Sequence, residues 1–290
     1  MTDFFKLERN GSSRILWNEE QINYIIEEYQ NTHSTGQIAQ QFETSTDSIR
    51  RVLKKNNVQI LSAQELQHAK HPRDSNFFNT INSPNKAYWL GFLYADGSVS
   101  ASNSTVALQL QEQDKSHLIK FRKALGNNNT LTRTEKYDST TKKSYYGYRY
   151  AIRDQQIHDD LIRQGCMPNK TYILTFPDND ILPTNLQSHF IRGYMDGDGY
   201  LGYYSPHNRP GINFRLVFYG TESMLKGIQK CLNKENLTLE NRFSHYVLKI
   251  VGNKQLEDIL KYIYQDSQPG IELDRKREIY DYFILKRFGD

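Results

Sequence analysis

The chain has 290 residues, enough for two or three domains, and aromatic residues make up 12% of it, with 20 tyrosines among them. Disorder along the whole chain is excluded, because disordered chains lack aromatic and β-branched residues. The formal net charge of +4 suits a polyanionic partner without requiring one.

Neither cysteine, Cys166 or Cys231, has CxxC spacing or a histidine at metal-ligand spacing. We therefore expect no disulfide framework, no structural zinc and a reducing compartment. No apolar run approaches the ~18 residues that a membrane span needs. The opening segment MTDFFKLERNGSS carries acids and has no apolar centre, unlike a signal peptide. We expect no membrane partner.

The N-terminal part carries the patterns of three short helices, and the polar stretch over 61–85 suits a linker. The helices are expected over 18–29, 35–42 and 47–57. Thr46 would cap the third helix after a turn at Thr44–Ser45. The third helix is basic and would face a polyanion, whereas the first helix is acidic and would face away from it.

The spacing of QIAQQF and TSTDSIRRVL in residues 37–53 resembles the helix-turn-helix of resolvase-like and transposase-like DNA-binding domains. The resemblance implies a small all-α domain over residues 1–60, with the third helix in the major groove. The residues that it places near DNA are Thr44, Ser45, Ser48, Arg50, Arg51 and Lys54. The alternative is a three-helix packing or protein-binding domain.

From residue 86 onward one series of helix and strand patterns occurs twice. The first copy has helices over 86–96, 116–125 and 155–163 and strands over 106–111, 131–137 and 145–153. The second has helices over 186–198, 222–232 and 254–264, strands over 212–219, 237–243 and 246–251, and a last helix over 272–288. Asp114 and Thr221 would cap the middle helices, and Gly97 and Gly199 would end the first ones. Such a repeat predicts two units related by a pseudo-twofold axis, at 86–180 and 181–290.

The first helix of each copy ends in a matching nonapeptide. Residues 89–97 read WLGFLYADG and residues 191–199 read IRGYMDGDG, so that Asp198 follows Asp96 by 102 residues. Gly91 and Gly193 would let two helices pack with their backbones close together, which brings the two aspartates side by side. One copy alone is an ordinary Asp-Gly turn at a helix end; two copies in this context indicate a site.

These nonapeptides resemble the LAGLIDADG motif, and residues 86 to about 288 resemble the single-chain, two-motif LAGLIDADG homing endonucleases. The resemblance implies an α+β fold, a pseudo-twofold pair of αββαββα units that form a DNA-binding saddle. Tyr94 departs from the motif where the family has its first acid, and Arg192 departs where the family has alanine. Arg192 could face solvent or DNA.

The family activity is cleavage of one phosphodiester in each strand of a long double-stranded DNA site. Asp96 and Asp198 would share two or three Mg²⁺ ions with the DNA phosphates, with Mn²⁺ as a substitute, because close carboxylates repel until a cation neutralises them. The backbone positions that the resemblance adds to this metal site are Ala95, Gly97, Gly197 and Gly199. One chain carries both aspartates, so a monomer is expected.

The resemblance also implies a basic residue near each catalytic aspartate. Lys170 and Lys276 are the matched candidates, because they follow Asp96 and Asp198 by 74 and 78 residues and are thus related by the repeat. They would polarise water or stabilise the phosphate. Two ordinary surface lysines are the alternative, and Arg153 and Lys249 are other candidates. Gln111 resembles the polar residue with which family members hold water, although it lacks a good counterpart in the second copy.

The outward sheet faces are expected to read DNA. Alternation points Val106, Leu108, Leu110, Phe214, Leu216 and Phe218 inward. The outward residues that suit base edges and phosphates are Gln109, Gln111, Arg149, Arg153, Arg209, Asn213, Arg215, Arg242 and Lys249. The alternative is a sheet face open to solvent.

Two other functions are alternatives to an endonuclease. A transcription regulator built on the same scaffold would lose the motif acids, and this chain keeps both. An intein would need a nucleophilic first residue and a terminal His-Asn, whereas this sequence begins with Met and ends in FGD. We expect a cytoplasmic protein of bacterial or phage type, with an organelle left open, and a role in intron homing.

Overall fold

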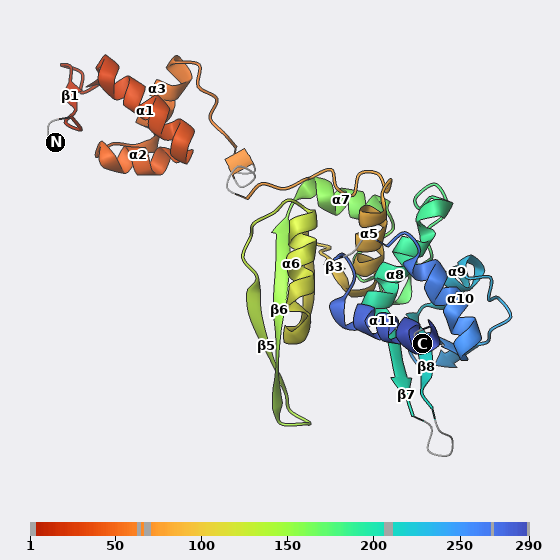
Figure 1. The fold of residues 1–290 in the computed structure, drawn as a ribbon. Coiled ribbons are helices and arrows are strands. Elements are labelled where there is room, and N and C mark those ends of the chain that lie inside the picture. Colours follow the sequence, from red (N-terminus) through yellow and green to blue (C-terminus); the bar gives the residue numbers. More distant parts are fainter. Residues whose placement is uncertain (1–3, 63–64, 67–70, 206–210, 268–269, 289–290) are drawn as a thin grey trace. The chain divides into compact units, whose positions relative to one another are not determined.

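The computed structural model describes residues 4–62, 65–66, 71–205, 211–267 and 270–288. The chain divides into two compact units, Met1–Pro72 and Arg73–Asp290 (Figure 1). None of the helices in the described residues is long and apolar enough to cross a membrane.

The N-terminal unit is a three-helix cluster with a short hairpin. Its elements are β1 (Glu8–Arg9), β2 (Ile15–Leu16), α1 (Glu19–Thr32), α2 (Thr35–Gln41) and α3 (Thr46–Lys55). Ile25, Ile38, Phe42 and Ile49 meet in its core. The aromatic rings of Phe5 and Trp17, at centroid distances of 5.0 and 5.3 Å from Phe42, close one side of that core. The three expected helices are present, and the hairpin was not predicted.

Side-chain caps set where these helices begin. Asn18 forms a capping box with Gln21 at the start of α1. The Ser45 side chain accepts a hydrogen bond from the backbone N–H of Ser48, so Ser45 is the N-cap of α3. The prediction of Thr46 as the cap was wrong. Thr46 is instead the first residue of the helix.

The first half of the second unit is built on a four-stranded antiparallel sheet, in the order β3-β4-β6-β5. Its elements are α5 (Pro84–Asp96), β3 (Gly97–Val99), β4 (Thr105–Gln111), α6 (Lys115–Ala124), β5 (Thr132–Asp138), β6 (Lys143–Arg153) and α7 (Gln155–Arg163). The 3-10 turn η1 (Glu112–Asp114) lies between β4 and α6, and η2 (Lys170–Tyr172) and η3 (Thr184–Leu186) follow α7.

The second half repeats this order. Its elements are α8 (Gln187–Asp198), β7 (Gly199–Tyr204), β8 (Asn213–Gly220), α9 (Glu222–Cys231), β9 (Leu239–Arg242), β10 (His245–Val251) and α10 (Asn253–Tyr264). The sheet runs β7-β8-β10-β9, and the extra helix α11 (Asp274–Phe288) follows. The α+β fold with two matching αββαββα halves is confirmed.

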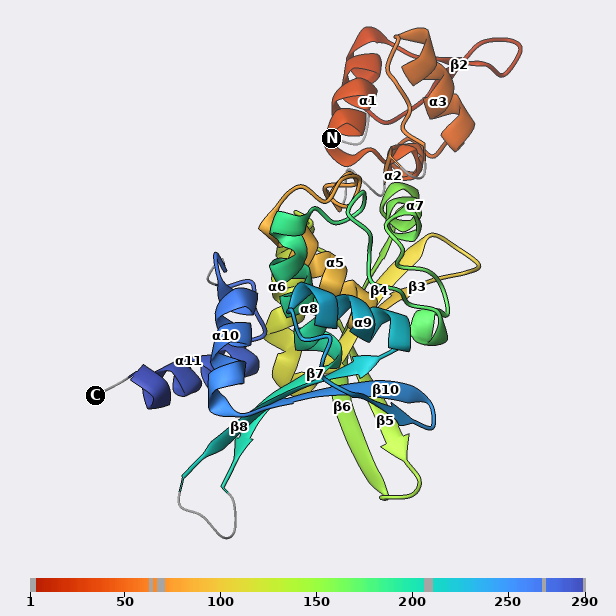
Figure 2. The same ribbon diagram turned by 90° about the vertical axis from the view of Figure 1, so that its right-hand side faces the viewer.

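Helices α5 and α8 lie side by side between the two halves (Figures 1 and 2). Both are buried around most of their circumference, which explains why α5 is apolar on every side rather than on one stripe. The β5–β6 and β7–β8 hairpins extend in one common direction away from these helices (Figure 2). Helix α5 runs directly into β3 and α8 into β7, so the C-terminal end of each helix lies at the start of a sheet.

Three details of the second unit differ from the sequence-based predictions. Phe77, Phe78 and Ile81, expected in a linker, are buried in the core. Asp114 makes no capping hydrogen bond to α6; its carboxylate accepts from Arg275 at 3.1 Å instead. Gly97 is the C-cap of α5, as predicted, but it has an extended conformation with φ −72° and begins strand β3, which was not predicted.

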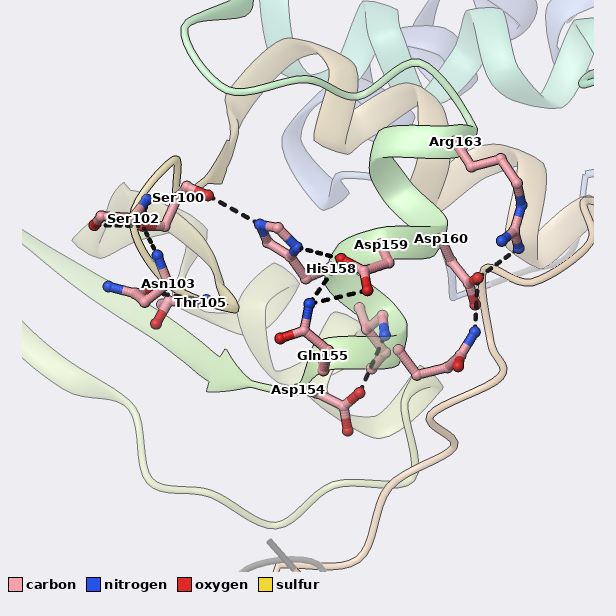
Figure 3. A network of polar contacts seen from close by, with 12 residues as sticks. Ser100, Ser102, Asn103, Thr105, Asp154, Gln155, His158, Asp159, Asp160 and Arg163 are labelled. Carbon is pink, nitrogen blue, oxygen red and sulfur yellow. Dashed lines mark hydrogen bonds and ion pairs between the residues drawn. The ribbon is translucent and has the colours of Figure 1, made fainter.

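A polar cluster ties the β3–β4 loop to helix α7 (Figure 3). The His158 ring contacts the Ser100 carbonyl oxygen through Nε2 and the Asp159 carboxylate through Nδ1, both at 2.9 Å. Asp154 caps the helix by accepting the Ile157 N–H at 3.1 Å. These bonds fix the helix that leads to Lys170.

Candidate active site

The close approach of α5 and α8 depends on two glycines related by the repeat. A Cβ atom on Gly91 would lie 2.0 Å from the Phe190 carbonyl oxygen, and one on Gly193 would lie 2.0 Å from the Tyr88 carbonyl oxygen. Both obstacles are backbone atoms, which cannot rotate away. The predicted reason for glycine at these positions is therefore supported by the geometry.

The same packing brings the two helix ends together. A Cβ atom on Gly197 would lie 2.3 Å from the Ala95 Cβ and 3.4 Å from Asp96 Oδ2. The carboxylates of Asp96 and Asp198 remain exposed to solvent on one side. Desolvation on the protein side, with the charge of Asp198, raises the pKa of Asp96 to about 6. Desolvation also raises the pKa of Asp198.

Two lysines flank the aspartates in equivalent places. Lys170 Nζ donates to the carbonyl oxygen of Gly97, and Lys276 Nζ donates to that of Gly199 at 2.7 Å. Each ammonium group thus lies at the residue that follows an aspartate. Both lysines lower the pKa of Asp96 and of Asp198, against the effect of desolvation. The structure brings together all four charged residues that the repeat had paired.

The two lysines differ in their surroundings. Lys170 is half-buried on the turn η2, whereas Lys276 is 1% exposed and also donates to the carbonyl oxygens of Met195 and Asp196. Burial lowers the pKa of Lys276 to about 8, although Asp196 opposes that shift. The halves of the site are therefore similar in layout and unequal in burial.

The helix ends fit a divalent cation by their donor chemistry. Two carboxylates with raised pKa values repel each other, and a hard cation that binds oxygen relieves that repulsion. In the described ranges no group of three or more His, Cys, Asp or Glu side chains is placed around a metal position. The carbonyl oxygens of Gly97 and Gly199 already accept from the lysines, so they would have to share or give up those bonds to become ligands.

Removing one carboxylate should stabilise the metal-free protein. Because the pKa of Asp96 is raised from 3.8 to about 6 in the folded chain, its ionisation lowers the free energy of unfolding. This loss of stability is absent below pH 3.8, where the carboxyl is protonated in both states, and it is complete above about pH 6, where it is ionised in both. We expect Asp198→Asn in EDTA to raise Tm at pH 7.5 by about 2–4 °C, on the order of 1 kcal/mol after solvent screening. Calorimetry would measure it.

Asp258→Asn on α10, where Asp258 is exposed, serves as the matched control and should leave Tm unchanged. The gain from Asp198→Asn should shrink at pH 4.5, and added Mg²⁺ should stabilise the wild type more than the variant. An Asp198→Asn protein that melts below the wild type at pH 7.5 in EDTA would refute the mutual repulsion.

Arg192 lies inside the protein, so the expectation that it faces solvent or DNA was wrong. Its guanidinium donates to the Ile263 carbonyl oxygen at 2.7 Å and contacts His189 Nδ1 at 3.0 Å. Glu272 lies 3.9 Å from Nε, and both side chains are buried. A buried cation needs such partners, and these come from parts of the chain that the local motif does not reveal.

Asp196 is a buried residue of the site to which the sequence reasoning gave no role. Its Oδ2 accepts from the Tyr88 hydroxyl at 2.6 Å and from the Leu273 N–H at 2.9 Å. The Tyr88 hydroxyl also contacts His117 Nε2 at 3.1 Å, and burial lowers the pKa of His117 to about 3, so that the ring is neutral. The sequence feature that could have indicated a role for Asp196 is its place at the sixth position of the nonapeptide, where the first copy has Tyr94 instead of an acid.

Gln111 lies on the outward face of β4, as predicted, but toward the far end of the strand. Gly97 pairs with Leu108, so Gln111 is three residues further along and pairs with Gly147. Its Oε1 accepts from Gln113 at 3.1 Å. A role of Gln111 at the aspartates stays a prediction.

The outward face of the first sheet is polar and exposed. The inward positions Val106, Leu108 and Leu110 are buried, as expected. Gln109 and Gln111 on β4 share the exposed face with Arg149 and Arg153 on β6. Gln109 Nε2 donates to Thr134 Oγ1 at 3.3 Å, which links this face to β5.

The outward face of the second sheet has partners for most of its charges. Phe214, Leu216 and Phe218 are buried, and Asn213 and Arg215 are exposed. The Arg215 guanidinium lies 5.0 Å from the ring centroid of Tyr200 and 5.6 Å from that of Tyr204.

Glu240 on β9 binds two cations of this face. Its carboxylate lies 2.5 Å from Arg242 and 2.7 Å from Lys249, so DNA would have to compete for both of these residues. Arg209, which was also expected on this face, lies outside the described residues.

The basic side chains of α3 are exposed on one side of the N-terminal unit. Ile49, Val52 and Leu53 face its core, while Arg50, Arg51, Lys54 and Lys55 are open to solvent. Arg50 lies 3.6 Å from Asp47 in an exposed pair of small energetic weight. Thr44, Ser45 and Ser48 lie in the turn and first helical turn before them.

Comparisons with known proteins give one family match and several similar folds. A family model described as Neugrin matches residues 10–143, less than half of the chain, and stops before α8. None of the curated proteins matches. Similar solved structures include "The homing endonuclease I-WcaI bound to its DNA recognition sequence", at 14% identity and a TM-score of 0.49, over 69% of this chain and 90% of that chain.

Two further similar structures have comparable values. The LAGLIDADG homing endonuclease I-GzeII in complex with its DNA target has 11% identity and a TM-score of 0.47, over 71% of this chain and 90% of that chain. The meganuclease I-SmaMI bound to uncleavable DNA has 10% identity and a TM-score of 0.46, over 71% and 92%. At these values the likeness carries no conclusion about activity.

Proposed function

We propose that this chain is a metal-dependent endonuclease that recognises a long double-stranded DNA site and hydrolyses one phosphodiester in each strand. One observation supports this most: two Asp–Lys pairs, related by an internal repeat, meet at adjacent helix ends. Both pairs belong to one chain, so a monomer would hold the complete site.

The residues suit hydrolysis of a phosphodiester. Water adds to phosphorus, one P–O ester bond breaks, and the products are a phosphate end and a hydroxyl end. Divalent metal such as Mg²⁺ at Asp96 and Asp198 would supply charge neutralisation and activation of water. Lys170 and Lys276 donate to the residues that follow the aspartates, so their positive charges would lie near a phosphate bound there and would stabilise the negative charge that it gains in the transition state.

The exposed sheet faces supply contacts for DNA. Gln109 and Gln111 offer amide groups to base edges, and Arg149, Arg153 and Arg215 offer guanidinium groups to bases or phosphates. Glu240 partly neutralises the basic charge of the second face, which favours base recognition over general attraction to phosphate. We infer that the two faces determine where the aspartates act.

Incubation with a randomised duplex library and Mg²⁺ would test the proposal. We expect one family of related sites to be cut in both strands, and no cuts when EDTA replaces Mg²⁺. Sequencing the ends reports the site and the overhang together. Selective retention of duplexes that stay intact would instead indicate a DNA-binding regulator on this scaffold.

We also propose that α3 of the N-terminal unit contacts DNA as a recognition helix. Arg51→Ala with Lys54→Ala should weaken binding and lower the salt dependence of log K by about two, roughly 0.9 per lost phosphate contact. The single-turnover cleavage rate at saturating protein should not change, because these residues lie outside the second unit. Filter binding over a salt series would measure the slope.

Lys6→Ala provides a matched control, since Lys6 is also exposed and basic but lies before α1. It should leave the salt dependence as in the wild type. If the Arg51→Ala, Lys54→Ala protein keeps the wild-type slope and affinity, α3 does not contact DNA and the N-terminal unit has another role.

A further inference from the structure

The side chain at the sixth motif position contacts the backbone of the lysine-bearing segment in both halves, at different places and with different chemistry. Tyr94 and Asp196 are 102 residues apart and both are buried. The Tyr94 hydroxyl donates to the Gln164 carbonyl oxygen at 2.6 Å, and Asp196 Oδ2 accepts the Leu273 N–H at 2.9 Å. Gln164 lies six residues before Lys170, and Leu273 lies three residues before Lys276. Each residue thus holds the backbone of the segment that carries the lysine of its own half.

We propose that Tyr94 and Asp196 are positioning residues, each of which holds the lysine of its own half at the end of α5 or α8. This inference rests on the proposed endonuclease function for its effect on cleavage. The contact itself does not depend on that function, because it joins a buried motif side chain to a backbone group in both halves.

The first half is built to admit the tyrosine. A Cβ atom on Gly165 would lie 2.1 Å from the Tyr94 hydroxyl oxygen, so only glycine leaves room for the contact. The neighbouring Gln164 side chain donates to the carbonyl oxygens of Phe78 and Asn79, at 3.1 and 3.0 Å, and thereby fixes the same segment from its other side. The Lys170 segment is therefore held at its start, while Lys170 itself stays half-buried.

The second half holds its lysine more firmly. Besides Leu273, Asp196 binds the Tyr88 hydroxyl of α5, and its own carbonyl oxygen accepts from Lys276 Nζ at 2.8 Å. The segment also docks on α6, where Lys120 donates to the Glu272 carbonyl oxygen at 2.7 Å and to Asp274 at 2.5 Å. The position of Lys276 therefore depends on residues from both halves.

Strand-specific kinetics would test these roles. With the full-length protein on a cleavable duplex labelled on each strand, Tyr94→Phe should slow the same strand as Lys170→Ala. Asp196→Ala should slow the other strand, the one that Lys276→Ala slows. We expect about 10-fold or more in the single-turnover rate, as a shift near 1 Å can cost up to about 100-fold. Tyr94→Phe should add little to Lys170→Ala, because both act on one group.

Tyr194→Phe is the matched control. Tyr194 is a buried tyrosine on α8 whose hydroxyl donates to the Tyr219 carbonyl oxygen at 2.8 Å, in a strand that carries neither lysine. It should show no strand bias. Equal slowing of both strands by Tyr94→Phe and Asp196→Ala would reduce the sixth position to a general structural role and overturn the proposal.

Amine labelling gives a second measurement that needs no cleavage. Acetylation followed by mass spectrometry should show severalfold faster labelling of Lys170 in Tyr94→Phe alone, and of Lys276 in Asp196→Ala alone. Wild-type labelling of both lysines in both variants would refute the positioning roles. A wild-type protein that cuts no duplex would refute the endonuclease proposal, whereas the labelling result would still decide this inference.

Discussion

Asp96→Asn combined with Asp198→Asn is expected to abolish DNA cleavage and to preserve DNA binding. Asparagine keeps the size of each side chain but removes the anionic oxygens that would hold the divalent ion. We expect the single-turnover rate in Mg²⁺ to fall by more than about 10³-fold, the scale reached when catalytic groups are removed from other hydrolases. Affinity should change little, since the exposed sheet faces stay intact, and it should rise slightly because less negative charge faces the phosphates.

The single variants sharpen this test. If each aspartate serves one strand, each single variant should accumulate nicked DNA, and the two nicks should fall on opposite strands. A doubly substituted protein that still cuts in Mg²⁺ would remove both residues from the active site. Loss of binding together with loss of cleavage would show that the variant had lost its fold or its DNA contacts.

The aspartate pair could be predicted from sequence because its determinants are local and repeated. Glycine at the third position and Asp-Gly at the end occur in both nonapeptides, and the helix period then fixes where the carboxylates emerge. The resemblance to the LAGLIDADG family called for a basic residue near each aspartate, and the similar spacings of 74 and 78 residues then selected Lys170 and Lys276. The aspartates needed only the repeat, the lysines needed the repeat together with the family resemblance, and neither needed knowledge of distant contacts.

The partners of the buried polar residues could not be predicted in this way. Arg192 meets the Ile263 carbonyl oxygen, 71 residues away, and Asp114 meets Arg275 across 161 residues. The local patterns instead favoured an exposed arginine and a helix cap. The packing of α10 against α8 decides the first contact and the packing of α11 against the first half decides the second, and a single sequence carries no signal for either.

Short strands and neutralised charges were missed for related reasons. The strand β3 begins at the glycine that ends α5, so the helix-ending signal concealed the start of a strand. Lys249 and Arg242 could be placed on an outward face by alternation, but alternation does not reveal that Glu240 lies beside both. Charge predictions for a sheet face therefore need the register of its neighbours.

Gly91→Ala is expected to destabilise the second unit strongly, although alanine favours helix over glycine by about 1 kcal/mol. The added methyl group would lie 2.0 Å from a carbonyl oxygen of α8, so the two helices must separate. We expect a loss of ~3 kcal/mol, at the upper end of overpacking costs, and a fall in Tm of about 10 °C. Gly193→Ala should cost a similar amount, since it meets the equivalent carbonyl oxygen of α5.

Gly36→Ala separates packing from helix propensity. Gly36 lies in α2, where the nearest atom to an added Cβ is Ser34 Oγ at 4.0 Å, so this change should be neutral or stabilising for the N-terminal unit. Separation of α5 and α8 would also move Asp96 away from Asp198, so cleavage by Gly91→Ala should fall even below its melting temperature. A Gly91→Ala protein with wild-type Tm would mean that the helices do not meet at these glycines, and the paired aspartates would then lose their structural basis.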